Sequence, residues 1–379
     1  MDTKLDPIVN DGSDHSVKYE YKRQLVWRNI ILMFLLHCSA VYGLYLAIYD
    51  CQWSTFIWGY FIAIFSGTLG IQCGAHRLWC HRTYKAKLPL QILLVIFNTM
   101  ALENDIFEWS RDHRLHHKFS DTDADPHNSR RGFFFSHIGW LLCKKHPEVK
   151  EKGKTLDMTD LLNNPLIRFQ RAFYIPLVIV LWGLIPTYIP YYFWGESLFN
   201  AWFTCVILRY TYTLNITWCV NSAAHLWGMK PYDNSIAPVE ANMKNYLMGE
   251  GFHNYHHVFP WDYSASELGT WDTFNPATTF IDLFAWIGWA YDLKRASKDV
   301  VNNRQSKTGN SNFKHTSTSV EYMKGLSILT LPFWTFPLIR YNIWTIIKFV
   351  FTSVTQITLD SHQRLYAITS TIQSNMKFL

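Results

Sequence analysis

Four apolar segments, each long enough to cross a lipid bilayer, constrain the fold of this chain more than any other feature. A spanning helix needs about 20 apolar residues, because the hydrocarbon core is about 30 Å thick. The four segments are residues 29–48, 53–73, 172–194 and 198–220. Backbone polar groups inside a bilayer must be satisfied within the chain, so each segment is expected to be a helix. The sequence therefore predicts an all-α integral membrane protein with four transmembrane helices.

The composition agrees with a membrane protein. Charged residues make up 17% of the chain, below the quarter that is typical of soluble domains. The 17 Trp and 21 Tyr are residue types that favour membrane–water interfaces. The net charge of +6 is too modest and too dispersed to indicate a nucleic-acid partner, but it suits a membrane surface, an anionic substrate or an acidic partner. The shorter apolar stretch 88–102 is expected to lie at the interface or to pack within the protein.

The placement of Lys and Arg predicts the orientation in the membrane. Lys18, Lys22, Arg23 and Arg28 lie just before the first span, whereas the short links 49–52 and 195–197 carry no Lys or Arg. The connection 74–171 and the region after residue 225 are rich in both residue types. By the positive-inside rule, these longer regions form a cytosolic helical cap and the short links face the lumen.

The chain is expected to have three parts. Residues 1–28 form a cytosolic N-terminal segment, and residues 29–295 form the four-span core with its cap. Residues 296–379 combine a polar linker with an apolar tail. The stretch 302–319 is rich in polar residues and is expected to be disordered. The apolar stretch 325–354 contains two prolines and an arginine, and it could be a fifth span, an interfacial segment or a product of odd splicing or gene prediction.

Histidines gather in three short motifs and at one further position. His113, His116 and His117 are spaced three and four apart, so they share one face of a helix, and "HNYHH" (253–257) repeats this spacing. His76 and His81 are five apart and would diverge on an unbroken α-helix. The second span is therefore expected to end near His76, with His81 returning from the following turn.

Asn221 and His225 are four apart, at the end of the fourth span. Neutral imidazoles bind Fe, Zn, Cu and Ni, and nine are too many for one ion. Two metal ions fit the count and leave room for water or oxygen. The alternatives are a basic cytosolic face for the histidines, and a simple helix–helix hydrogen bond for Asn221. His127 is a candidate to support a metal ligand.

These motifs resemble those of the membrane-bound fatty acyl-CoA desaturases, most closely the stearoyl-CoA type. Their sequences are most similar to those of insect members. The similarity lies in "HRLWCHRTYKAKLPL", "RDHRLHHKFSDTDADPHN", "NSAAHLWG" and "GEGFHNYHHVFPWDYSASE". The resemblance implies a di-iron centre at the endoplasmic reticulum membrane, facing the cytosol, with Asn221 acting through a water. The implied metal residues are His76, His81, His113, His116, His117, Asn221, His225, His253, His256 and His257.

The implied reaction uses dioxygen and two electrons to insert a cis double bond, of the delta-9 type, into a saturated long-chain acyl-CoA. An unactivated methylene has no acidic proton, so a redox metal suits this chemistry better than zinc. The His-Pro-Gly-Gly haem signature is absent, so the electron donor is expected to be a separate cytochrome b5 with its NADH-dependent reductase. The alternatives are a membrane di-iron hydroxylase and a His-rich metal transporter. The spans contain almost no polar ligands at mid-membrane depth, which argues against a transporter.

The resemblance also implies contacts with the substrate. Tyr60 and Ile64 share a helix face and are placed at the methyl end of the acyl tunnel, whereas "APVE" (237–240) resembles a signature of eighteen-carbon preference. Gln72 and Cys73 replace the family's usual Thr-Ala, which leaves the position of the double bond open. The implied CoA contacts are Arg28, Asn29, Asn104, Arg111, Asp112, Lys144 and Lys145.

Overall fold

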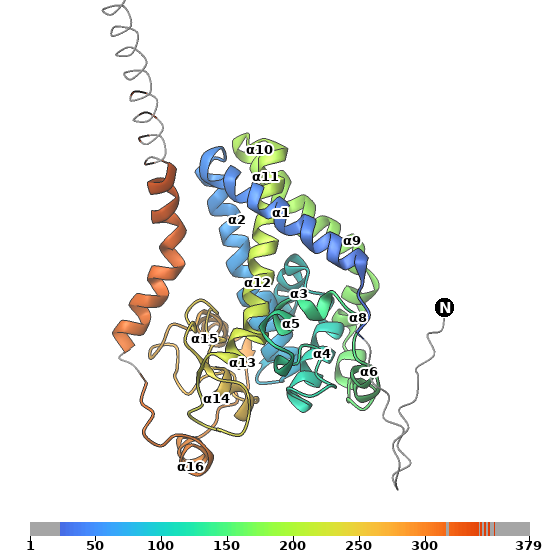
Figure 1. Ribbon diagram of the computed structural model, residues 1–379, viewed down its shortest axis with the longest axis vertical. Coiled ribbons are helices and arrows are strands. Elements are labelled where there is room, and N and C mark those ends of the chain that lie inside the picture. Colours follow the sequence, from blue (N-terminus) through green and yellow to red (C-terminus); the bar gives the residue numbers. More distant parts are fainter. Residues whose placement is uncertain are drawn as a thin grey trace, which may run out of the picture. The chain divides into compact units, whose positions relative to one another are not determined.

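The computed structural model describes residues 23–315 and 318–340, together with 342, 345, 348 and 352. The described part is mostly helical, as predicted, with only two pairs of two-residue strands (Figure 1). The chain divides into a compact unit that ends at Ile328 and a second unit that begins at Leu329. The proposed metal residues all lie in the first unit.

Three described helical segments are long and apolar enough to cross a membrane. The first is α1 (Trp27–Tyr49), and the second joins α2 (Trp53–Phe65) to the π-helix η1 (Ser66–Cys80). The third runs through α9 (Tyr174–Val178), η4 (Ile179–Leu184) and α10 (Ile185–Trp194). The chain is therefore a membrane protein, and these segments match three of the four predicted spans.

The fourth predicted span is also helical, but it is less apolar than the other three. It runs through α11 (Leu198–Ala201), η5 (Trp202–Leu208) and α12 (Arg209–Asn221), and it packs against α1 and α2. Its polar side chains face the protein: the Arg209 guanidinium is buried and donates to the carbonyls of Cys205 and Met100. Polar groups at this depth are tolerated because protein, not lipid, surrounds them.

The short apolar stretch at 88–102 packs within the protein. It forms α3 (Leu88–Ala101), which lies against η1 and buries Leu90 and Leu94. The chain then bends by 82° into α4 (Ile106–Lys118). Asp105 caps α4 by accepting a hydrogen bond from the Glu108 backbone amide. This bend aims α4 and its histidines across the end of η1.

The cap consists of short helices gathered beyond the ends of α2 and α12 (Figure 1). Its core includes Leu94, Ile106, Leu161 and Ile281. The strands pair antiparallel, β1 (Lys85–Ala86) with β4 (Ala290–Tyr291) and β2 (Gly228–Met229) with β3 (Glu240–Ala241). The remaining cap helices are η2 (Ser129–Arg131), α5 (Phe133–His137), η3 (Gly139–Leu141), α6 (Pro147–Gly153), α7 (Thr159–Leu162), α8 (Pro165–Ala172), α13 (Ala223–Leu226), α14 (His253–Val258), α15 (Pro276–Trp286) and α16 (Lys298–Thr308).

The prediction of a disordered linker over 302–319 is wrong for its described part. Residues up to Thr308 belong to α16, which Ser297 caps. Arg304 pairs with the buried carboxylate of Asp233, and the Thr308 hydroxyl donates to the Tyr232 carbonyl. Composition alone misjudged this segment because its order comes from contacts with the cap.

Candidate metal centre

The first histidine pair is aligned by a π-helix. The helix that begins at Trp53 does not end near His76, as the sequence suggested, but continues as η1 to Cys80. The backbone amide of His81 donates to the carbonyl of His76 at 3.0 Å, which is the five-residue hydrogen bond of a π-turn. This wider turn brings residues five apart onto one face, so the two imidazoles converge.

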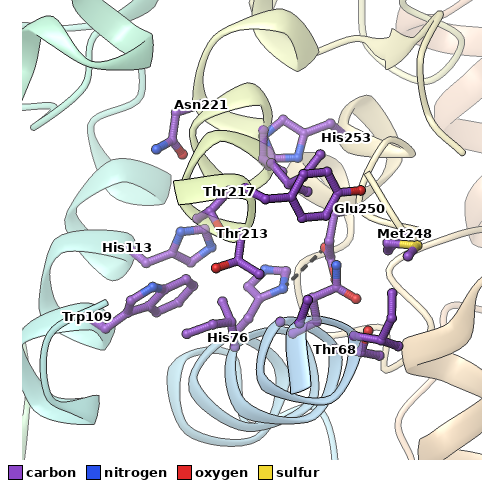
Figure 2. A pocket seen from close by; sticks show the side chains of 18 residues that line it. Thr68, His76, Trp109, His113, Thr213, Thr217, Asn221, Met248, Glu250 and His253 are labelled. Carbon is purple, nitrogen blue, oxygen red and sulfur yellow. Dashed lines mark ion pairs between the residues drawn. The ribbon is translucent and has the colours of Figure 1, made fainter. Parts of the chain in front are cut away.

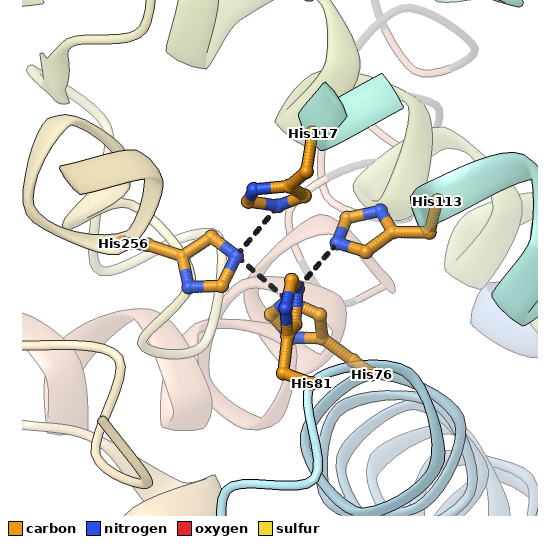
Figure 3. Close-up of side chains that lie close together, drawn as sticks. All are labelled: His76, His81, His113, His117 and His256. Carbon is orange, nitrogen blue, oxygen red and sulfur yellow. Dashed lines mark hydrogen bonds between the residues drawn. The ribbon is translucent and has the colours of Figure 1, made fainter. Parts of the chain in front are cut away.

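The nine histidines form two groups of nitrogen ligands. Within each group, one ligand atom from every residue lies within 4.8 Å of all the others. Figure 3 shows the first group, in which imidazoles from η1, α4 and α14 point toward one another. The larger group contains His76, His81, His113, His117 and His256, and the smaller contains His116, His225, His253 and His257.

The contacts between imidazoles fit metal ions. The Nε2 atom of His256 lies 2.9 Å from that of His76 and 3.0 Å from that of His117. In the other group, the Nε2 atom of His253 lies 3.0 Å from that of His225 and 3.1 Å from that of His257. Neutral imidazoles cannot satisfy so many converging nitrogens with their own protons. A cation between the nitrogens would satisfy all of them at once.

Three carboxylates hold the outer nitrogens of these histidines. The Nδ1 atom of His116 lies 2.9 Å from Asp125, and that of His225 lies 3.3 Å from Asp121. The Nδ1 atom of His76 lies 3.3 Å from Glu250. A carboxylate on Nδ1 fixes the tautomer that leaves Nε2 free for a metal.

The sequence reasoning missed these three carboxylates. Their signal was present in the acidic "DTDAD" run after the second motif and in "GEG" before the third. His127 lies where its predicted supporting role requires, since its Nδ1 atom is 3.4 Å from Asp125. His127 also forms a third group with His116 and Asp125.

Burial sets the protonation states around the site. Desolvation, together with neighbouring imidazoles, holds the pKa values of His81, His253, His256 and His257 well below the usual range. Burial alone would raise the pKa of Glu250, but Arg77 and His76 outweigh it and hold that pKa at about 2. These four histidines are therefore neutral and the Glu250 carboxylate is ionised at pH 7, which is the state that metal binding needs.

An apolar cavity, here called the inner cavity, ends at the histidines (Figure 2). Figure 2 shows Trp109 and His113 of α4 and Thr213 and Thr217 of α12 around it, with His76 and His253. Asn221, the last residue of α12, lines this cavity beside His113 and His253.

A second cavity, here called the outer cavity, shares lining residues with the first. Trp109, His113, Thr217 and Asn221 line both cavities. The other lining residues of the outer cavity include Asn104, Asp112 and Leu141. The two cavities together describe a path that passes the histidines.

Of the predicted CoA residues, Asn104 and Asp112 line the outer cavity, and Asn29, Arg111 and Lys145 contact its lining residues. The Asn29 side chain donates to the Leu141 carbonyl at 2.8 Å, which holds the start of α1 against the segment that carries Lys144 and Lys145. Asp112 accepts from the guanidinium of Arg111 and from Lys145. Arg28 and Lys144 are exposed, and the Lys144 backbone amide donates to the Gln24 carbonyl just before α1.

The two residues predicted at the methyl end of the acyl tunnel, Tyr60 and Ile64, differ in position. Ile64 lines the inner cavity, whereas Tyr60 is not among its lining residues. Gln72 lines the same cavity, and its Nε2 atom donates to the Leu247 carbonyl at 3.2 Å. Gln72, which replaces the family's usual residue, therefore lies in the wall of the cavity, one helical turn before His76.

Comparison with known proteins decides the family. The chain matches the description "Fatty acid desaturase" over residues 51–271. It is 55% identical over 303 residues to an acyl-CoA Delta-9 desaturase of Acheta domesticus, which covers 79% of this chain and 84% of that protein. The chain belongs to the fatty acid desaturase family. It is an acyl-CoA desaturase, an oxidoreductase that makes double bonds.

Relatives within this desaturase family differ in what their names describe. The chain is 54% identical over 314 residues to the stearoyl-CoA desaturase of Homo sapiens, covering 83% of this chain and 85% of that protein. It is 56% identical over 295 residues to an (11Z)-hexadec-11-enoyl-CoA conjugase of Bombyx mori, covering 77% of this chain and 88% of that protein. Membership therefore establishes acyl-CoA desaturation but not the position of the double bond.

Proposed function

We propose that this desaturase holds two iron ions in its two histidine groups and uses dioxygen to insert a cis double bond into a long-chain saturated acyl-CoA. The observation that carries the proposal is that histidines from both converging groups line an apolar cavity. An apolar cavity suits an alkyl chain, and imidazole ligands suit iron.

Bound iron would supply the oxidising power to remove hydrogen from an unactivated methylene. The larger group would hold one ion with five imidazoles, and the smaller group would hold the other with four. Asn221 would orient a water in the remaining space beside the second ion. Asp121, Asp125 and Glu250 would keep three of the imidazoles in the tautomer that binds metal.

The chain's own residues would select which carbons react. Ile64, Thr68 and Gln72 form one wall of the inner cavity, and Thr213 and Thr217 face them from α12. A chain held between these walls presents only a few methylenes to the metals, because positioning within about an ångström decides reactivity. We expect the double bond at the delta-9 position, with Gln72 as the residue best placed to alter it.

The outer cavity would receive the CoA end of the substrate. Asn104 and Asp112 line it, and Arg111 and Lys145 lie against Asp112. Arg28, Asn29 and Lys144 would contact the anionic head group from the start of α1 and the segment beside it. These contacts bind a part of the substrate that does not react, so they would act mainly on affinity.

The electron source would be cytochrome b5 with its NADH-dependent reductase, docking on the basic face of the cap. The distribution of Lys and Arg supports a cytosolic cap, and the site would face the cytosol from the endoplasmic reticulum membrane. Complementary charge would steer an acidic donor toward this face.

Expression in yeast that lacks its own desaturase tests the proposal. We expect growth without added unsaturated fatty acid, and mass spectrometry of the lipids should show cis-monounsaturated chains. A His116→Ala variant expressed at the same level serves as the inactive control. Hydroxylated chains without new double bonds would overturn desaturation in favour of a hydroxylase.

A further inference from the structure

One wall of the inner cavity is a long turn, residues 242–251, which contains no helix or strand. Met248 and Glu250 of this turn line the cavity. The Leu247 carbonyl accepts a hydrogen bond from Gln72 on the adjoining wall, and Glu250 pairs with His76. The shape of the cavity therefore depends on how this turn is held.

The turn cannot hold this conformation by local preference alone. Met248 has a φ of 53° and Gly249 a φ of 99°. Residues other than glycine rarely adopt positive φ values. A Cβ atom on Gly249 would lie 2.4 Å from the Asn275 side-chain oxygen. Backbone of this kind persists only where the surrounding structure enforces it.

Residues 318–328, here called the 318–328 segment, supply part of that surrounding structure. The carboxylate of Glu321 is 2% exposed and lies 3.1 Å from Nζ of Lys244. It also accepts a hydrogen bond from the Asn245 amide at 3.4 Å. Lys244 and Asn245 are adjacent residues of the turn, so one buried carboxylate holds two of its side chains.

A second contact joins the 318–328 segment to the far end of the turn. Gly325 packs directly on the ring of Phe274, since a Cβ atom there would lie 2.1 Å from the Phe274 ring carbon. Phe274 precedes Asn275, the residue that packs against Gly249. The segment thus contacts the turn directly at Lys244 and indirectly at Gly249.

We propose that Glu321 is a positioning residue for acyl-chain selection in this desaturase. By holding Lys244 and Asn245, it fixes the turn that carries Met248, and so sets the width of the inner cavity from outside. The inference rests on the proposed role of the inner cavity as the acyl site. It gives the segment after His315 a function in the reaction, although this segment carries none of the histidine motifs.

The test compares product ratios for full-length variants in the yeast strain. Glu321→Gln removes the charge and keeps the shape, and Lys244→Met removes the ammonium, which lies 5.2 Å from the Phe252 ring centroid, and keeps an unbranched apolar side chain. Each is expected to change the ratio of sixteen- to eighteen-carbon products by about twofold or more. The double variant should change the ratio by less than the two single variants combined, because both substitutions break the contact between Lys244 and Glu321. Hydrogen–deuterium exchange of the purified protein should rise in residues 242–251.

The matched control is Glu151→Gln, which removes the carboxylate of an exposed pair with Lys154 on α6. It should leave the product ratio unchanged. A uniform loss of all products with an unchanged ratio in Glu321→Gln would overturn the inference, since that is what a purely structural contact predicts. A chain ending at residue 315 provides a second variant and should shift the ratio in the same direction.

Ile64→Ala separates this inference from the assignment of the cavity. If Ile64→Ala shifts the product ratio and Glu321→Gln does not, the inner cavity holds the acyl chain and only the role of Glu321 fails. If neither variant shifts the ratio, both the cavity assignment and the inference fail.

Discussion

At the scale of single residues, the site depends on pairs of side chains rather than on histidines alone. His116 contributes Nε2 to the smaller group while Asp125 holds its Nδ1 atom. The Nε2 atom of His116 is buried and has no hydrogen-bond partner in the described structure. A buried nitrogen without a partner is costly, so a bound ion is the natural explanation for this arrangement.

Replacing single metal-site histidines should abolish desaturation. His113→Ala, His116→Ala and His257→Ala each remove one of the converging nitrogens, and the remaining ligands cannot restore the geometry. The measurement is unsaturated lipid per unit of expressed protein, with iron content measured in parallel. His146→Ala, outside both groups, should stay active. Full activity in His116→Ala would contradict the dimetal assignment.

Charge reversal at the outer cavity should act on affinity. Lys144 is exposed beside the start of α1, where the anionic head group is proposed to bind. Lys144→Glu should raise KM for acyl-CoA by about tenfold and lower kcat much less, because contacts with a remote group act on ground and transition states alike. Lys307→Glu, on α16, is the control. An unchanged KM at low salt would remove Lys144 from the CoA site.

At the scale of elements, the helical winding of the second span decides whether His76 and His81 lie on one face. An α-helix through His76 and His81 would place them about 140° apart, whereas the π-helix η1 brings them together. The same element continues toward the membrane as α2 and carries Ile64 into the inner cavity. One continuous helical segment therefore supplies both metal ligands and a wall of the substrate cavity.

Shortening Ile64 should lengthen the preferred acyl chain. Ile64→Ala removes three carbons from the cavity wall, and each buried methylene of substrate is worth about 0.8 kcal/mol. Selectivity should move from sixteen- toward eighteen-carbon products by up to about tenfold. The fatty acid profile of the yeast strain gives the ratio directly, and Tyr60→Phe, outside the lining residues, serves as a comparison. If the ratio holds while total activity is retained, Ile64 does not limit chain length.

At the scale of the whole molecule, the metal groups join segments far apart in the sequence. His76 contacts His256, which is 180 residues away in the sequence, and Arg77 donates a hydrogen bond to Glu250, which is 173 residues away. The buried cap therefore closes around the site from several directions. The C-terminal region takes part as well, since α16 and Glu321 contact the cap. Truncation after residue 305 would remove Thr308 and Glu321 together with these contacts, and we expect it to impair desaturation.

Removing the metal should destabilise the folded protein. An ion that binds the folded state alone adds to stability by mass action, and its loss should lower the unfolding temperature by about 5–10 °C. The measurement is thermal unfolding of the purified protein before and after chelation. Zinc should restore the unfolding temperature without restoring desaturation, because imidazoles bind both metals but zinc has no redox chemistry. An unchanged unfolding temperature after complete metal loss would contradict a metal-centred cap.

The sequence by itself determined the features that depend on local spacing. Helical periodicity places His113, His116 and His117 on one face, and apolar length predicts the spans, because both are set within a few turns of chain. Resemblance to a known family implied the reaction, and comparison confirmed acyl-CoA desaturation.

Only the tertiary structure decided how distant segments combine. Periodicity does not predict that His116 belongs to a different ligand group from His113 and His117. That division depends on how α4, α13 and α14 pack. The contact between Glu321 and Lys244 likewise joins segments with no local signal for each other. Such contacts follow from the packing of the whole cap, which no single stretch of sequence encodes.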